Sequence, residues 1–125
     1  MTDTPDIALL GYMMDSVMAE LRRIGHPVEH GALAALPTER RAAITCAVTS
    51  AVGGARPELL DLLPNLRRIV SAGAGRDRFD HDDLARRGIE LCDTGALVSS
   101  DTAEMAVALV YALARDLVHA DDHVR

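Results

Sequence analysis

The sequence predicts an α/β fold in which a doubly wound, parallel five-stranded sheet carries helices on both faces. Two observations support this prediction. Short apolar runs of strand length alternate with segments of helical spacing from residue 7 to residue 92. Parallel strands also need crossover connections, which such helices supply. The length of 125 residues is that of one ordinary domain, and no linker or low-complexity segment breaks the alternation.

The first half of the chain supplies three of the five expected strands. Apolar residues recur at helical spacing after the first strand, and Gly25 and Pro27 end that helix. The expected elements are strands at residues 7–10, near residue 28 and at 44–48, with helices at 14–24 and 37–41.

The second half repeats this plan and completes the sheet. Gly88 is a suitable residue to close the helix before the last strand, because glycine tolerates the left-handed conformation. The expected elements are strands at residues 67–71 and 89–92, with helices at 57–63 and 82–87.

The last helix is expected to begin near Thr102, because Asp101 and Glu104 have the spacing of a capping box. Residues 105–114 are all apolar or Tyr, and ten residues are too few to span a membrane. A helix that is apolar all round must be covered on more than one side. We therefore expect a substrate-binding domain over residues 1–100, and a helix over 101–125 that packs on a second copy or on a further domain.

Composition excludes some classes of partner. The formal charge of -6 and the scarcity of aromatic residues, two Tyr and one Phe, argue against nucleic-acid binding. Cys46 and Cys92 lie in apolar runs and are expected to be packed thiols. The absence of a signal peptide and of a membrane-length apolar stretch makes the cytoplasm the expected compartment.

The loops that follow the strands are the expected binding region, because ligands of open parallel sheets bind beyond the carboxyl ends of the strands. Three loops contain small residues whose amides suit a carboxylate or a phosphate: residues 49–54, 71–80 and 93–100. The second contains Gly73 and Gly75, but Arg78 stands where a dinucleotide fingerprint has its third glycine. A plain strand-to-helix turn is the alternative interpretation of that loop.

Groups suited to acid–base or metal chemistry have structural alternatives. His119 and His123 lie one helical turn apart, but the solvated end of a helix explains them better than a metal site. The acidic residues after the glycine loop, Asp80, Asp82 and Asp83, are better explained as caps of the next helix than as catalytic carboxylates. We assign no catalytic residue and no metal ligand.

Three motifs in order resemble the D-isomer-specific 2-hydroxyacid dehydrogenases. Residues 64–80 (PNLRRIVSAGAGRDRFD) are similar to the family's strand, Gly-x-Gly turn and spaced aspartates. Residues 87–93 (RGIELCD) resemble the Arg-Gly-Ile strand that follows, and residues 102–104 (TAE) resemble the start of an Ala/Leu-rich helix. The resemblance implies a flavodoxin-like substrate-binding, or catalytic, domain.

The resemblance also implies a function that needs more than this chain. Members of the family reduce a small 2-oxo acid, or oxidise the D-2-hydroxy acid, with NAD or NADP. Their nucleotide-binding domain follows the last helix of this chain and carries the catalytic Arg, Glu and His. The implied partners are the small acid and either a homodimer mate or that domain, packed on the helix at 102–118.

Site residues follow from matching positions in the family. The loop that holds the substrate carboxylate corresponds to Val52, Gly53 and Gly54, and we also expect Ser71 to contact substrate. The residues expected to approach the cofactor are Gly73, Ala74, Gly75 and Thr102.

Two positions depart from the family pattern. Asp93 begins Asp-Thr-Gly where the family has Asn-Thr-Pro, so a carboxylate that repels an anion stands there unless it is paired or protonated. Ala74, in the glycine turn, offers only its backbone for hydrogen bonding. The alternative to an enzyme part is a non-catalytic, truncated or orphan domain that binds a small acid or associates with itself.

Overall fold

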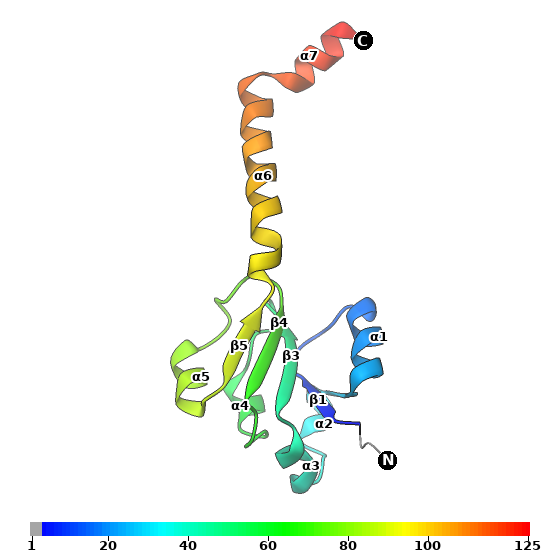
Figure 1. Ribbon diagram of the computed structural model, residues 1–125, viewed down its shortest axis with the longest axis vertical. Helices are drawn as coiled ribbons and strands as arrows, with labels where there is room; N and C mark the ends of the chain where they lie inside the picture. Colours follow the sequence, from blue (N-terminus) through cyan, green and yellow to red (C-terminus); the bar gives the residue numbers. More distant parts are fainter. Residues whose placement is uncertain (1–3) are drawn as a thin grey trace. The chain divides into compact units, whose positions relative to one another are not determined.

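Five parallel strands form one sheet, in the order β2-β1-β3-β4-β5, in the computed structural model of the protein, which describes residues 4–125 (Figure 1). This is the flavodoxin-like order of doubly wound sheets, and it confirms the predicted fold class. The strands are β1 (Asp6–Leu9), β2 (His26–Glu29), β3 (Cys46–Ser50), β4 (Arg68–Ala72) and β5 (Glu90–Asp93).

The helices between the strands follow the predicted alternation. One short helix, α2, was not expected, and α4 ends earlier than its apolar pattern suggested. Gly88 closes α5 in the left-handed conformation, with φ of 67°, as predicted. The helices are α1 (Asp15–Ile24), α2 (His30–Leu33), α3 (Thr38–Ala43), α4 (Pro57–Leu60) and α5 (His81–Arg87).

Two groups of buried side chains cover the two faces of the sheet unevenly. One face packs under α2, α4 and α5 and holds the larger group, with Leu33, Ile44 and Ile69 fully buried. The other face packs under α1 and holds a smaller group around Leu9 and Leu21. In Figure 1, α1 lies on one face of the sheet and α4 and α5 lie on the other.

The chain divides into two compact units, Met1–Thr94 and Gly95–Arg125. The second unit contains α6 (Gly95–Ala114) and α7 (Leu117–Val124), and no residue of either helix is buried. The prediction that the last helix begins near Thr102 is wrong. The helix begins at Gly95, so Asp101 lies inside it and does not cap it.

Polar residues in the first turns of α6 explain why the predicted start of this helix was wrong. Ser99 and Thr102 donate their hydroxyls to the carbonyls of Gly95 and Val98, at 2.6 and 2.8 Å. Such hydrogen bonds to the preceding turn allow polar residues to lie inside a helix. In the sequence, the same residues are typical of a loop followed by a helix cap. By length and composition alone, the 20 residues of α6 are enough to cross a membrane, which contradicts the expectation that no apolar stretch of membrane length is present.

A single helix over residues 101–125 is also incorrect. Asp116 has φ of 50° and separates α6 from α7. Aspartate is one of the few residues other than glycine that adopt this left-handed conformation readily. The second unit therefore contains two helices, and the apolar run of residues 105–114 lies entirely in α6.

Candidate functional site

Three loops meet at the carboxyl edge of the sheet, after β1, β3 and β4. A Cβ atom on Gly11, after β1, would lie 3.3 Å from Cα of Gly53, after β3. Contact this close between two backbones requires a residue without a side chain. Glycines therefore bring the first two loops together.

The loop after β3 is held by its own hydrogen bonds. Thr49, fully buried, donates its hydroxyl to the carbonyl of Gly54 at 2.7 Å. The amide of Gly53 donates to the Ser50 hydroxyl at 3.0 Å, and the amide of Gly54 donates to the Ser50 carbonyl at 2.9 Å. Two of the three predicted substrate-binding amides thus have partners within the loop. The amide of Val52 has no acceptor among residues 4–125 and is the one open donor of the three.

Gly54 has a structural role in this loop. Its φ is 63°, and a Cβ there would lie 2.4 Å from the carbonyl oxygen of Arg78. Its close contact with Arg78 joins the loop after β3 to the loop after β4. The second glycine of the Gly-Gly pair thus fixes the shape of the edge.

The Gly-x-Gly turn after β4 is anchored at its first glycine. The amide of Gly73 donates to the Thr94 hydroxyl at 3.0 Å, and the Thr94 amide donates to the Gly73 carbonyl at 3.3 Å. Gly73 has φ of 142°, and a Cβ there would lie 2.8 Å from that of Ala51. Ala74 and Gly75 are exposed, and the described residues offer no acceptor to their amides. The turn is thus fixed at one end and open at its tip.

Ser71, which we expected to contact substrate, has no exposed surface. It is fully buried on β4, beside Thr49 of β3 and Asp93 of β5 in the strand register. Its hydroxyl oxygen has no hydrogen-bond partner among the described residues. A substrate contact at Ser71 stays a prediction, and this burial does not favour it. Thr102 lies in the second unit, inside α6, away from the start of the helix where we expected it.

The carboxylate that departs from the family pattern is paired. Arg76, from the loop after β4, contacts the Asp93 carboxylate at 2.5 Å, and the Asp93 side chain is only 12% exposed. The positive guanidinium offsets the charge of Asp93. We expected Asp93 to repel an anionic ligand unless its carboxylate is paired or protonated, and the ion pair with Arg76 meets this requirement.

A pocket of about 390 Å³ opens at the same edge of the sheet. It collects residues from the loops after β1 and β3 and the last residue of β4. Val52 and Gly53, two of the predicted substrate-binding residues, form part of its wall. The lining residues are Tyr12, Met13, Met14, Ser50, Val52, Gly53 and Ala72.

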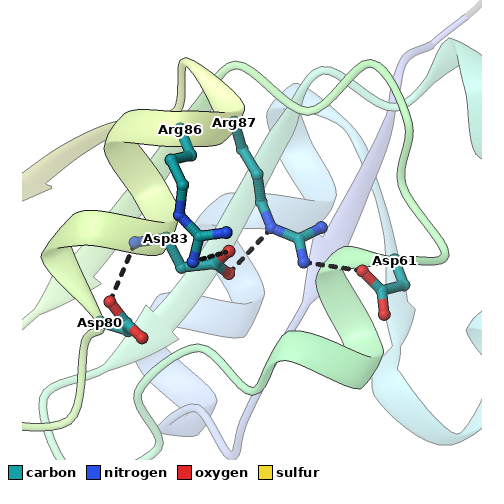
Figure 2. A network of polar contacts seen from close by, with 5 residues as sticks. All are labelled: Asp61, Asp80, Asp83, Arg86 and Arg87. Atoms are coloured by element: carbon teal, nitrogen blue, oxygen red, sulfur yellow. Dashed lines mark hydrogen bonds and ion pairs between the residues drawn. The ribbon is translucent and has the colours of Figure 1, made fainter.

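The acidic cluster after the glycine loop is structural, as its capping pattern predicted (Figure 2). The Asp80 carboxylate accepts the amide of Asp83 at 2.9 Å and caps α5. The buried Asp83 carboxylate binds Arg86 and Arg87, at 3.2 and 2.8 Å. Arg87 also binds Asp61 at 2.7 Å, and this hydrogen bond is the main cause of its raised pKa. These carboxylates tie α5 to the end of α4.

The histidine pair and the cysteines show no site either. His119 lies 2.6 Å from the Asp116 carboxylate on an exposed surface, and residues 4–125 contain no cluster of three or more side chains that could hold a metal. Cys46 and Cys92 are free and half-buried. Burial raises the pKa of the Cys46 thiol, an effect that nearby Arg68 opposes. Cys46 therefore favours the neutral, unreactive form.

Several residues of this edge were missed by sequence reasoning. Thr94 anchors the glycine turn, and Arg76 neutralises Asp93. Opposite charges on two loops of the same edge were a usable signal for the second contact. The apolar side of the pocket had no such signal, because Tyr12 and Ala72 come from separate elements.

Comparison with known proteins gives one consistent family. Residues 15–116 match the family described as D-isomer specific 2-hydroxyacid dehydrogenase, catalytic domain. The chain is 40% identical over 83 residues to a 2-ketogluconate reductase of Gluconobacter oxydans, covering 66% of this chain and 27% of the relative. It is 34% identical over 85 residues to glyoxylate/hydroxypyruvate reductase A of Arabidopsis thaliana, covering 68% and 27%.

A solved structure supports the same comparison. The NADPH-dependent glyoxylate/hydroxypyruvate reductase of Sinorhizobium meliloti, in complex with NADP and malonate, is similar with a TM-score of 0.67 and 25% identity. The match covers 87% of this chain and 34% of that one. The chain thus spans 27% of the length of the two curated relatives.

Proposed function

This chain belongs to the D-isomer-specific 2-hydroxyacid dehydrogenases, by a match of residues 15–116 to their catalytic domain, and from this we propose its function. We propose that it forms the substrate-holding part of an NAD(P)-dependent enzyme that interconverts a small 2-oxo acid and its D-2-hydroxy acid. The open amide of Val52 beside a pocket at the carboxyl edge of the sheet is the observation that carries the proposal.

The arrangement suits a carboxylate because its open donors are backbone amides on a fixed frame. The bonds of Thr49 and Ser50 hold the loop after β3, so the amide of Val52 needs little reordering to accept an anion. Arg76 offsets the nearby charge of Asp93. In this proposal the loop binds and orients the acid, and the pocket excludes water from one side of it.

The glycine turn fits the approach of a nicotinamide cofactor. Its tip, at Ala74 and Gly75, is exposed and has open amides, while the bond from Gly73 to Thr94 fixes its base. The bound cofactor would supply or accept the hydride. We propose NAD or NADP, contacted by residues 73–75 and by Thr102.

The chain alone is expected to be inactive. Hydride transfer to a carbonyl needs a positioned proton donor and a positive group. In the family that this chain belongs to, we expect these groups in the nucleotide-binding domain, and Arg76 of this chain is engaged by Asp93. We therefore expect purified protein to show no oxidation of NADH with glyoxylate or hydroxypyruvate, and turnover above background would contradict this expectation.

Calorimetric titration with oxalate or glyoxylate tests the acid-binding role directly. We expect measurable heat at millimolar ligand in the intact chain. Val52→Pro removes the open amide hydrogen and should abolish the signal. Val52→Ala keeps that amide and is the matched control. No heat from the unmodified chain at millimolar ligand would leave the proposal without support.

A second candidate function has its own supporting observation. Residues 105–114 of α6 are apolar or Tyr and none is buried, which suits self-association. The alternative is a non-catalytic domain that binds a small acid or forms a homodimer through the helix at 102–118. In the enzyme proposal a nucleotide-binding domain would cover the same helix. We also propose a cytoplasmic location, which two free cysteines support.

The two candidates differ in what the gene encodes and in how the protein associates. Coding sequence after residue 125 with a strand, a complete Gly-x-Gly-x-x-Gly turn and a helix would support the enzyme part. A concentration-dependent dimer in light scattering, with no such sequence, would support the alternative. A monomer at every concentration, with no partner, would contradict the homodimer.

A further inference from the structure

The pocket at the carboxyl edge is apolar on most of its wall. Tyr12, Met13 and Met14 come from the loop after β1, and Ala72 ends β4. No charged residue lines it. Methionine side chains are flexible and polarisable, so they adapt to branched or aromatic groups. The wall therefore suits a carbon substituent better than a charged or hydroxylated one.

Polar groups in this wall are few and partly engaged. The Ser50 hydroxyl already accepts the amide of Gly53 at 3.0 Å. The Tyr12 side chain is 80% exposed, so its hydroxyl can remain in water while the ring covers a ligand. A polyhydroxylated acid would leave most of its hydroxyls without partners here, and unpaired buried hydroxyls are costly.

The size of the pocket also favours a larger substituent. Its volume of about 390 Å³ lies in the range of small-molecule sites, which is about 300 to 1,000 Å³. A two-carbon acid such as glyoxylate would fill only a small part of that space. A branched or aromatic group would fill more of it and displace water from apolar wall.

The position of the pocket connects it to the carboxylate. Val52 is one of the residues that line the pocket, and it carries the open amide. Gly53 lines the same wall and is held in place by Ser50. An acid bound at the Val52 amide thus has the pocket beside it.

We propose that this pocket receives the substituent of the substrate and selects 2-oxo acids with an apolar, branched or aromatic group over glyoxylate and over sugar acids. This inference rests on the proposed substrate-holding function. Its specificity-determining side chains are Tyr12, Met13, Met14 and Ala72, with Val52 joining the pocket to the anion.

Amide chemical shifts of the full chain, titrated with three acids at constant ionic strength, test the proposal. The acids are glyoxylate, 4-methyl-2-oxopentanoate and 2-ketogluconate. All three should shift the amides of Val52 and Gly53. The branched acid should bind roughly tenfold more tightly than the other two, because only its substituent is buried against apolar wall.

Two variants localise this preference. Ala72→Leu fills part of the pocket and should remove the tenfold advantage of the branched acid over glyoxylate. Val52→Ser keeps the backbone amide but makes part of the wall polar, and because this side chain is 81% exposed the fold should tolerate it. Ile24→Ser is the matched control, since it makes an exposed apolar side chain of the same unit polar outside the pocket.

The outcomes separate this inference from the function on which it rests. Equal affinities, or tighter binding of glyoxylate or 2-ketogluconate, with shifts at Val52 and Gly53, would overturn the pocket assignment and support the acid-holding loop. No shift with any acid would contradict both. An advantage of the branched acid that survives in Ala72→Leu and Val52→Ser would also overturn the assignment.

Discussion

The two units of this chain use apolar residues in opposite ways. In the first, each face of the sheet has a buried group, and Leu33, Ile44 and Ile69 are fully buried. In the second, α6 is more continuously apolar than any strand, yet none of its residues is buried, and Leu113 is 82% exposed. Apolar content alone therefore does not make a core. A core also needs a second surface to pack against.

The same contrast separates the binding roles of the two units. The loops of the first unit are held by internal hydrogen bonds and by the ion pair of Arg76 with Asp93, which is consistent with the proposed acid-binding role. The second has a surface suited to a partner. The proposed acid-binding loop therefore draws on contacts within the first unit, whereas the apolar surface of α6 has no buried residue.

The largest expected effect comes from making the same substitution in each unit. Leu33→Ala removes a fully buried side chain and should lower the free energy of unfolding by about 3 to 5 kcal/mol. Leu113→Ala removes an exposed one and should change it by less than about 0.5 kcal/mol. Urea unfolding followed by circular dichroism measures both. An equal loss in Leu113→Ala at high protein concentration only would show that α6 is covered by association.

A second pair of variants compares a packed loop with an open helix inside the first unit. Gly54→Ala places a Cβ against Arg78 at positive φ and should cost about 2 to 3 kcal/mol in unfolding free energy. Gly31→Ala, in α2, meets no atom within 4 Å and should stabilise the protein by roughly 0.5 to 1 kcal/mol. The same denaturation experiment applies. Similar effects at both positions would contradict the close contact with Arg78.

The ion pair between Arg76 and Asp93 should have a smaller effect on stability and a clear effect on binding. Because the Arg76 side chain is 54% exposed, a double-mutant cycle with Arg76→Gln and Asp93→Asn should give a coupling energy of about 0.5 to 1 kcal/mol. Arg76→Gln alone should weaken oxalate binding, since it removes the positive charge beside Asp93. The double variant should restore binding. Unchanged oxalate affinity in Arg76→Gln would show that Asp93 does not act on the ligand.

The smallest expected effect is on the reactivity of the Cys46 thiol, which lies on β3. Burial raises the pKa of the Cys46 thiol above its ordinary value, so folding favours the neutral form. The neutral thiol's contribution to the free energy of unfolding is complete below the pKa of Cys46 in the unfolded chain. It is lost as the pH rises through the pKa of Cys46 in the folded protein. In a Cys92→Ser background, alkylation of Cys46 should therefore be slower in the folded protein than in urea, and the rate should rise at higher pH. Equal pH profiles in the two states would contradict the shift.

Local signals in the sequence predicted the sheet well. Alternating apolar runs located the strands, and Asp80 and Gly88 marked the two ends of α5 because a cap depends on neighbouring residues. The predicted start of α6 was wrong because it depended on polar residues that have two possible roles. Ser99 and Thr102 satisfy their hydroxyls inside the helix, and no local pattern distinguishes this from a loop followed by a cap.

The candidate site was predictable in position but only partly in its contacts. The rule for parallel sheets indicated the edge at which the pocket with Val52 and Gly53 opens, and binding of an acid there stays a prediction. It did not reveal that the amides of Gly53 and Gly54 are used within the loop, or that Ser71 is buried. These facts depend on how the loops pack in three dimensions. The resemblance to a family identified residues, and the structure distinguished the roles of several of them.

The strand order has a consequence for how the chain folds while the ribosome synthesises it. β1 lies between β2 and β3, and its first pairing with β3 joins Ala8 to Ala47, so the sheet cannot close until distant segments have been made. Chains emerge from the amino end and domains fold as units. The last strand, ending at Asp93, emerges before α6. The sheet can therefore fold before α6 leaves the exit tunnel of the ribosome. This order reduces the chance that the apolar side chains of α6 bind to strands that have not yet paired.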